Sequence, residues 1–170
     1  MDDETQSEFI ESWGSMGMLW GINRSMARIH ALLIVSEKPL GLDEIAQRLE
    51  ISRGNTSMSL KDLRAWGVIR RVHQSGDRRD LYVAESDPWT VVFRIARERK
   101  RREFDPGLEA VNRALARTGE DEGEVQARLR GMQELMLTVD RVLNRLLGDP
   151  GMSQMILRFL TTQVSGRSKG

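Results

Sequence analysis

Apolar residues recur close to every 3.6 positions along the first part of the chain, which predicts one long helix over residues 8–37. The repeat consists of Phe9, Trp13, Met16, Trp20, Met26, Ile29 and Leu33. Glycines at positions 14, 17 and 21 interrupt it. Glycines on neighbouring turns indicate either tight packing against another helix or a bend that lines a ligand pocket. Lys38-Pro39 ends the helix, because the residue before a proline disfavours helical backbone.

The next segment, residues 38–86, has the pattern of two short helices followed by a β-hairpin. Residues 42–49 form the first amphipathic helix. Ser52 is a good N-cap for a second helix over residues 53–66, and Gly67 stands where a helix-ending glycine belongs. The inward positions of this second helix are Thr56, Leu60 and Leu63. Two alternating runs, 68–72 and 81–84, flank a polar loop with a glycine, which predicts the hairpin.

The chain after residue 86 is predicted to be helical again. Asp-Pro pairs at 87–88, 105–106 and 149–150 each combine an N-cap aspartate with a proline at the first helical position. Spacings of four and three then define a seam made of Val125, Leu129, Met132, Met136, Val139, Leu143 and Leu146. Such a seam packs either within one chain or between two. Its length, and the way Leu135 and Val142 widen it, favour a dimer interface.

Composition excludes several classes of protein. The 170 residues contain no cysteine, which excludes a disulfide scaffold and a thiolate metal site. The two histidines, His30 and His73, are far apart in sequence and offer little for a histidine-rich metal site or a histidine-based triad. There is no glycine-rich phosphate loop and no metal-ligand spacing, so we expect no enzyme, no metal and no cofactor. The longest apolar stretch, residues 13–35, contains Arg24, Arg28 and His30 and therefore does not span a membrane. We expect a cytoplasmic protein.

Two helices followed by a basic hairpin are the order of a winged helix-turn-helix, the DNA-binding module in which a recognition helix enters the major groove. Residues 48–80 carry eight basic and four acidic side chains, a local charge of +4 against +1 for the whole chain. The candidate DNA-binding residues on the second helix are polar or cationic, with one methionine: Ser52, Arg53, Asn55, Ser57, Met58, Ser59, Lys61 and Arg64. On the hairpin they are Arg78 and Arg79, which Asp77 is placed to support.

Two further features have a functional and a structural interpretation. Arg94, Arg97 and residues 99–102 form a second basic run, which is either a solvated helix face or a set of phosphate contacts beside the half-site. Trp13, Trp20 and Trp89 are either core residues or a cage for a quaternary ammonium ligand such as choline or betaine.

The segment from Leu42 to Arg79 resembles the MarR superfamily of bacterial regulators. The resemblance is carried by Leu-Asp-Glu-Ile-Ala at 42–46, Leu-Arg-Ala-Trp-Gly-Val-Ile-Arg at 63–70 and Gly-Asp-Arg-Arg at 76–79. Ser-Arg-Gly-Asn-Thr-Ser-Met-Ser, at 52–59, is most similar to the glycine-betaine-synthesis repressor branch. The resemblance implies a homodimer, a palindromic operator and a helical dimerisation region. The stretch 84–88 lacks the leucine-threonine element that many superfamily members have after the wing, which argues against the multidrug-sensing branch.

These patterns together predict a mainly α-helical chain with a small β-hairpin wing. We expect an N-terminal packing or dimer-contact helix at 1–37, a winged helix-turn-helix domain at 38–86, a helical dimerisation region at 87–165 and a disordered tail at 166–170. The predicted function is that of a homodimeric, sequence-specific regulator of transcription that binds double-stranded DNA, acts as a repressor and responds to a choline- or betaine-like effector. The alternative is a winged-helix module that binds proteins and not DNA.

Overall fold

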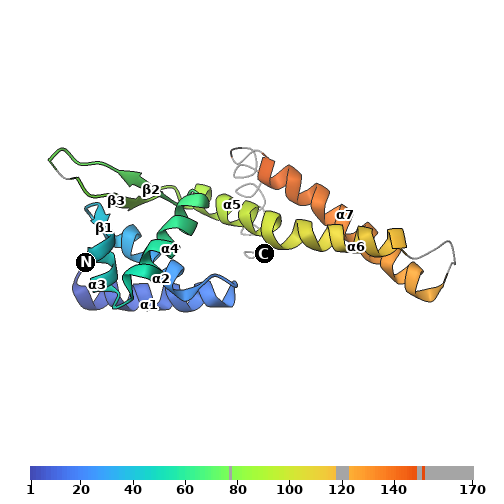
Figure 1. Ribbon diagram of the computed structural model, residues 1–170, viewed down its shortest axis with the longest axis horizontal. Coiled ribbons are helices and arrows are strands. Elements are labelled where there is room, and N and C mark those ends of the chain that lie inside the picture. Colours follow the sequence, from blue (N-terminus) through green and yellow to red (C-terminus); the bar gives the residue numbers. More distant parts are fainter. Residues whose placement is uncertain (77, 118–122, 149–150, 152–170) are drawn as a thin grey trace, which may run out of the picture. The chain divides into compact units, whose positions relative to one another are not determined.

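The chain is mostly helical with one small antiparallel sheet, as predicted (Figure 1). The structure is a computed structural model, and it describes residues 1–76, 78–117, 123–148 and 151. The chain divides into two compact units, Met1–Arg94 and Ile95–Gly170. The predicted Asp149-Pro150 helix start and the predicted tail lie outside the described residues.

The N-terminal region contains two helices, α1 (Asp3–Leu19) and α2 (Arg24–Val35), so the prediction of a single helix over residues 8–37 was wrong. The break comes at Gly21, whose φ of 72° is a left-handed conformation that suits glycine and ends a helix. Asn23 then caps α2, because its side-chain oxygen accepts the backbone N–H groups of Ser25 and Met26. The apolar repeat continued across this turn and concealed it.

Helices α1 and α2 pack closely through glycine. A Cβ atom placed on Gly17 would lie 2.5 Å from the Cβ of Ala27, closer than two carbon atoms approach without a bond. A Cβ atom on Gly14 would lie 2.7 Å from Cγ of Arg28. Arg28 also forms an ion pair with Glu11 of α1, at 2.7 Å. The tight-packing interpretation of Gly14 and Gly17 is therefore confirmed.

The winged helix-turn-helix follows in the predicted order. Strand β1 (Leu40–Gly41) leads into α3 (Leu42–Arg48) and then α4 (Arg53–Ala65), and the hairpin consists of β2 (Ile69–Val72) and β3 (Leu81–Ala84). The strands lie in the order β1-β3-β2, with Ile69 opposite Ala84 and Leu40 opposite Tyr82. Two-residue strand β1 was not predicted, because it is too short to show an alternating pattern.

The core of the first unit joins α2, α3, α4 and the sheet. Its most completely buried side chains come from these three helices and from the residue just before β2: Ile29, Ile45, Thr56, Leu60 and Val68. Leu63 is also buried, so all three predicted inward positions of α4 are confirmed. Burial of one face fixes which face of α4 remains in solvent.

The described part of the second unit consists of helices. Helix α5 (Pro88–Arg99) begins in the first unit and continues through a π-helical turn, η1 (Lys100–Phe104), into α6 (Asp105–Arg117). Asp87 caps α5 as predicted, accepting the backbone N–H of Thr90 at 3.0 Å. Asp105, however, is helical and follows η1 without a loop, so it does not start a separate helix. The wide π turn is where the chain meets Pro106, which cannot donate a backbone hydrogen bond. Helix α7 (Glu124–Gly148) packs against α6.

Candidate nucleic-acid interface

Helix α4 presents one polar face to solvent. Its N-cap is Ser52, whose Oγ accepts the backbone N–H of Asn55 at 3.2 Å, and its C-terminal glycine, Gly67, has a φ of 73°. Both ends were predicted from the sequence. The exposed residues of the helix are Arg53, Gly54, Asn55, Ser57, Met58, Lys61, Arg64 and Ala65. Met58 is 70% exposed, which is unusual for a large apolar side chain and places it where a partner can reach it.

Ser59 was wrongly predicted to contact DNA. It is 4% exposed, and its hydroxyl donates to Oδ1 of Asn55 at 3.3 Å. The amide of Asn55 in turn donates from Nδ2 to Oγ of Ser25, at the start of α2, at 2.9 Å. Both ends of the Asn55 amide are thus bonded within the protein. Ser25 was missed because nothing local in the sequence relates it to a residue thirty positions later.

The cations of α4 differ in their surroundings. Arg53 forms an ion pair with Asp43 of α3 at 3.1 Å, and both side chains are largely exposed. Lys61 and Arg64 are exposed, and neither forms an ion pair with any carboxylate in the described part of the chain. Exposed pairs such as Arg53–Asp43 contribute little to stability, about 0–1 kcal/mol, so an anionic ligand can displace them. Three positive charges are therefore available along this face.

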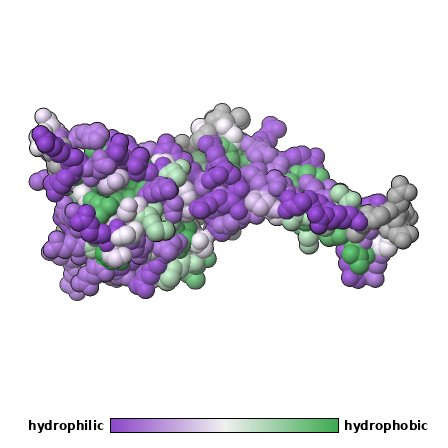
Figure 2. Space-filling model, in the orientation of Figure 1, coloured by the Kyte–Doolittle hydropathy of each residue, from purple (hydrophilic) through white to green (hydrophobic). Residues whose placement is uncertain are grey.

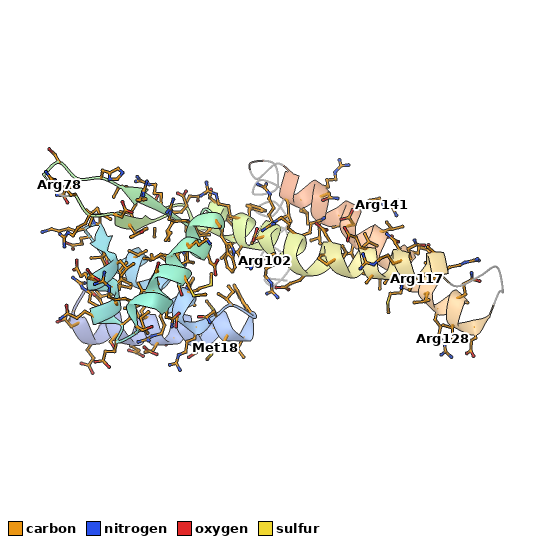
Figure 3. The ribbon with its side chains drawn as sticks, viewed as in Figure 1. Met18, Arg78, Arg102, Arg117, Arg128 and Arg141 are labelled. Carbon is orange, nitrogen blue, oxygen red and sulfur yellow. The ribbon has the colours of Figure 1, made fainter. Side chains whose placement is uncertain are left out.

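The hairpin adds a second group of cations. Arg78 and Arg79 are exposed, and Figure 3 shows Arg78 at the hairpin tip. Gly76 precedes them with a φ of 85°, so the turn depends on glycine there. Lower on the hairpin, Arg71 pairs with Asp80 at 3.0 Å. Asp77, the predicted support of the wing arginines, lies outside the described residues.

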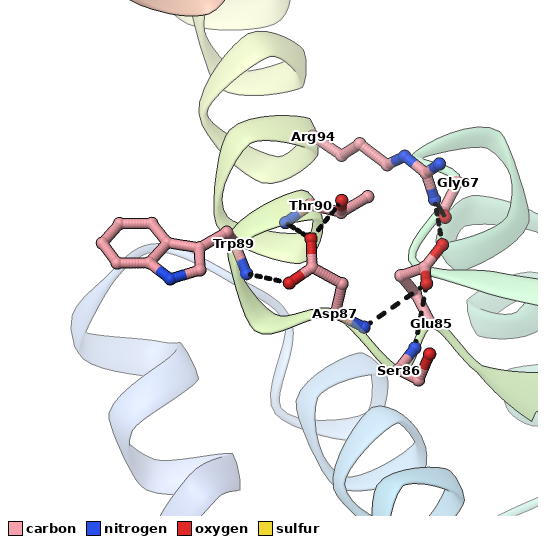
Figure 4. Close-up of polar contacts among 7 residues, drawn as sticks. All are labelled: Gly67, Glu85, Ser86, Asp87, Trp89, Thr90 and Arg94. Atoms are coloured by element: carbon pink, nitrogen blue, oxygen red, sulfur yellow. Dashed lines mark hydrogen bonds and ion pairs between the residues drawn. The ribbon is translucent and has the colours of Figure 1, made fainter. Parts of the chain in front are cut away.

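A cluster of partly buried polar contacts joins the base of the wing to the end of α4 and the start of α5 (Figure 4). Nη1 of Arg94 donates to the carbonyl oxygen of Gly67 and to Oε2 of Glu85, the latter at 2.9 Å. The carboxylate of Glu85 also accepts the backbone N–H of Ser86 and of Asp87. These backbone donors, followed by Arg94, lower the pKa of Glu85. The cluster was not predicted, since Arg94 was assigned only to a basic run.

The rest of that basic run is largely neutralised by acidic partners. Each of these cations lies close to a carboxylate: Arg99 to Glu103 at 2.8 Å, Arg101 to Glu98 at 2.6 Å, and Lys100 to Asp105 and Asp140 at 2.6 and 2.7 Å. Hydrogen bonds from Lys100 to its two aspartates raise the pKa of the lysine. The arrangement favours the structural interpretation of this run over phosphate contact.

The apolar seam of α7 is only partly covered. Leu129, Met136, Val139, Leu143 and Leu146 are half-buried, and a Cβ on Gly107 of α6 would lie 3.4 Å from the end of Met136. Other apolar side chains of the helix are exposed: Val125, Met132, Leu135, Leu137 and Val142. Hydrophobic patches accordingly interrupt the hydrophilic surface of the second unit in Figure 2. The half-buried residues of the seam therefore pack in part against α6, and a dimer contact through its exposed residues stays a prediction.

The three tryptophans of the predicted ligand cage have different surroundings. The Trp13 ring lies 5.5 Å from Phe9 and 6.3 Å from His30, between centroids. The Trp89 ring stacks on Phe93 at 6.3 Å. Trp20 follows the last residue of α1 and is 54% exposed. A cage made by all three stays a prediction.

Two other kinds of feature are absent from the described residues. Acidic, histidine and cysteine side chains there do not gather in threes that could hold a metal ion. Nor does that part of the chain contain a helix long and apolar enough to cross a membrane.

Comparison with known proteins identifies the segment that contains α4 and most of the wing. Residues 20–80 match the MarR family. Two Bacillus subtilis proteins are similar to the chain. The HTH-type transcriptional repressor GbsR is 24% identical over 67% of this chain and 63% of the GbsR chain. A protein named as HTH-type transcriptional regulator YvaV is 22% identical over 50% of this chain and 48% of the YvaV chain. The chain thus spans about half to under two thirds of these relatives.

A crystal structure of a transcriptional regulator supports the fold. It is 23% identical, with a TM-score of 0.65 over 85% of this chain and 96% of that one. The matched family and relatives are transcriptional regulators and not enzymes, which agrees with the prediction that this chain is not an enzyme. The segment of residues 20–80, which holds α4 and most of the wing, is thus similar to the MarR family, and the chain as a whole is similar to GbsR.

Proposed function

We propose that this protein is a homodimeric regulator of transcription that binds double-stranded DNA in a sequence-specific manner and acts as a repressor. The observation that carries the proposal is the exposed face of α4, where Lys61 and Arg64 have no acidic partner in the described part of the chain. Unpaired cations on a rigid helix attract phosphates and donate to guanine. Repression is proposed because the relative GbsR is named a repressor.

The proposed readout divides the residues into three roles. Met58, exposed and apolar, suits contact with a thymine methyl group. Arg53, Lys61 and Arg64 contact guanine edges or phosphates, and Ser52 and Ser57 donate to phosphates. Arg78 and Arg79 enter the minor groove, where the negative potential is strongest. We propose that Asn55 positions α4, because its amide is bonded to Ser25 and Ser59, and its contact with DNA stays a prediction.

A second copy of the chain is proposed to cover the exposed apolar side of α7. Val125, Met132, Leu135 and Val142 follow one another at spacings of seven, three and seven residues, which places them on one stripe of the helix. An apolar stripe of this length is costly to leave in water. Dimerisation also explains how two recognition helices could bind two half-sites of one operator.

The effector is proposed to be a quaternary ammonium compound held against tryptophan. Trp20 is more than half exposed, and an indole face attracts such a cation by about 0.5–2 kcal/mol. Tryptophan fluorescence in the presence of millimolar choline or betaine tests this. An unchanged spectrum would remove the effector from the proposal without affecting DNA binding.

The test of DNA binding is a salt series on a duplex from the region upstream of the protein's own gene, with unrelated duplex as competitor. We expect a steep fall in affinity with salt and a preference of at least about a thousandfold for the operator. Lys61→Gln with Arg64→Gln should reduce the log–log slope by about two, or about one per lost phosphate contact. The matched control is Arg99→Gln with Arg102→Gln, which removes the same charge from ion-paired positions and should leave the slope unchanged.

The outcomes separate the candidate functions. Steep salt dependence without preference would indicate an operator elsewhere. If the folded dimer fails to bind any duplex at low salt, DNA binding is refuted and a protein-binding winged helix becomes the better account. A reduced slope in the control pair alone would move the phosphate contacts from α4 to the second basic run.

A further inference from the structure

Gly54, the second residue of α4, has no structural reason within the described chain to be glycine. Its φ is not positive, and a Cβ atom placed on it would meet nothing within 4 Å. Glycine is, after proline, the least favourable residue inside a helix, because it loses the most backbone freedom. Alanine at this position would therefore fit the free protein and stabilise α4.

Other glycines of the first unit do have such reasons. Gly17 is required by the contact with Ala27, and Gly21 and Gly67 have positive φ values. Gly131 of α7 resembles Gly54, since it is also exposed within a helix and has open space where a Cβ would be. A glycine of this kind lowers the stability of its helix, and no contact within the described protein requires it. Whether a binding partner requires it depends on where the glycine lies.

Gly54 lies on the proposed DNA-binding face, near the N-terminal end of α4. Residues three, four and seven places further along a helix share a side with it, and here these are Ser57, Met58 and Lys61, all exposed. The hydrogen bond from Asn55 to Ser25 holds this end of α4 against α2, so the helix cannot simply turn another side outward. In a helix-turn-helix the N-terminal residues of the recognition helix come closest to the base edges.

We propose that Gly54 is a specificity-determining residue at which base edges of the major groove approach the backbone of α4, and that a side chain there would block the approach. The inference rests on the proposed function, because it needs a duplex on this face. The proposed role of Gly54 affects a different property of binding from the one that the cations affect. Phosphate contacts support binding to any duplex, whereas close approach to base edges matters only on the operator.

The experiment uses the full chain with Gly54→Ala and Gly54→Ser. Affinity is measured for a duplex selected by the wild-type protein from a random-sequence pool and for an unrelated duplex, and stability is measured by urea unfolding. We expect Gly54→Ala to raise the unfolding midpoint, to weaken operator binding at least about tenfold, and to change binding to unrelated duplex less than about twofold. Gly54→Ser should weaken operator binding further. Gly131→Ala calibrates how far this exchange stabilises an exposed helix.

Each other result is informative. Wild-type operator affinity in Gly54→Ala overturns the inference while the proposed function stands. A lower unfolding midpoint means that the glycine serves the fold, which also overturns it. Equal loss on both duplexes means that the backbone of DNA, and not its base edges, approaches this position, against the proposal. If the wild-type protein selects no duplex from the pool, the proposed function itself fails.

Discussion

The contact between α1 and α2 allows one methyl group to be moved from one helix to the other. In Gly17→Ala the new Cβ would lie 2.5 Å from that of Ala27, about 1 Å inside an ordinary contact, so the helices must separate. Overpacking of this kind costs about 1–3 kcal/mol, and the gain in helix propensity returns at most about 1 kcal/mol. Ala27→Gly alone loses propensity and a buried methyl, roughly 2 kcal/mol together.

The double variant Gly17→Ala with Ala27→Gly restores a single methyl at the contact. We expect its free energy of unfolding to lie within about 1 kcal/mol of wild type, so that the two changes couple by about 2 kcal/mol. Urea unfolding followed by tryptophan fluorescence measures this, because all four tryptophans lie in the first unit. Effects that simply add would show that the two Cβ positions are not in contact, and the packing described for α1 and α2 would be refuted.

Three further predictions concern His30, Arg94 and the exposed side of α7. Burial lowers the pKa of His30 to about 4, so below about pH 6.5 the unfolded chain binds a proton that the folded chain does not. The free energy of unfolding should therefore fall by up to roughly 3 kcal/mol as the pH drops from 6.5 to 4. His30→Leu should flatten that pH profile when unfolding is measured across the acid range. Arg94→Met should lower the stability of the first unit by about 1–2 kcal/mol, discounted for partial exposure, and an unchanged urea midpoint would mean that the contacts with Gly67 and Glu85 contribute nothing. Met132→Glu with Leu135→Glu should convert the proposed dimer to a monomer in light scattering, and a persistent dimer would place the interface elsewhere.

The winged helix-turn-helix could be predicted because its ends are determined by local chemistry. Ser52 and Gly67 mark the limits of α4 in the sequence as clearly as in the structure, and the buried stripe between them has helical spacing. The exposed face followed from that stripe. Ser59 was the exception, because its burial depends on Asn55 and on a residue of another helix.

Other parts depended on information that periodicity does not carry. The turn between α1 and α2 was signalled by Gly21 and Asn23, but the apolar repeat on both sides outweighed it. The π turn before Pro106 has no sequence pattern of its own. The apolar positions of α7 were found, but spacing alone could not divide them between α6 and solvent.

The hydrogen bond between Asn55 and Ser25 limits how this protein can be redesigned. With α4 as the proposed recognition helix, the simplest change of DNA target would be to transplant that helix alone. Here the amide that orients that helix is anchored on a residue of α2, outside any transplanted segment. If residues 53–64 were moved into another protein, Asn55 would lose its hydrogen bond to Ser25. If a helix from another protein replaced α4 here, Ser25 would face whichever residue took the place of Asn55. The portable unit is therefore the helix together with the first turn of α2.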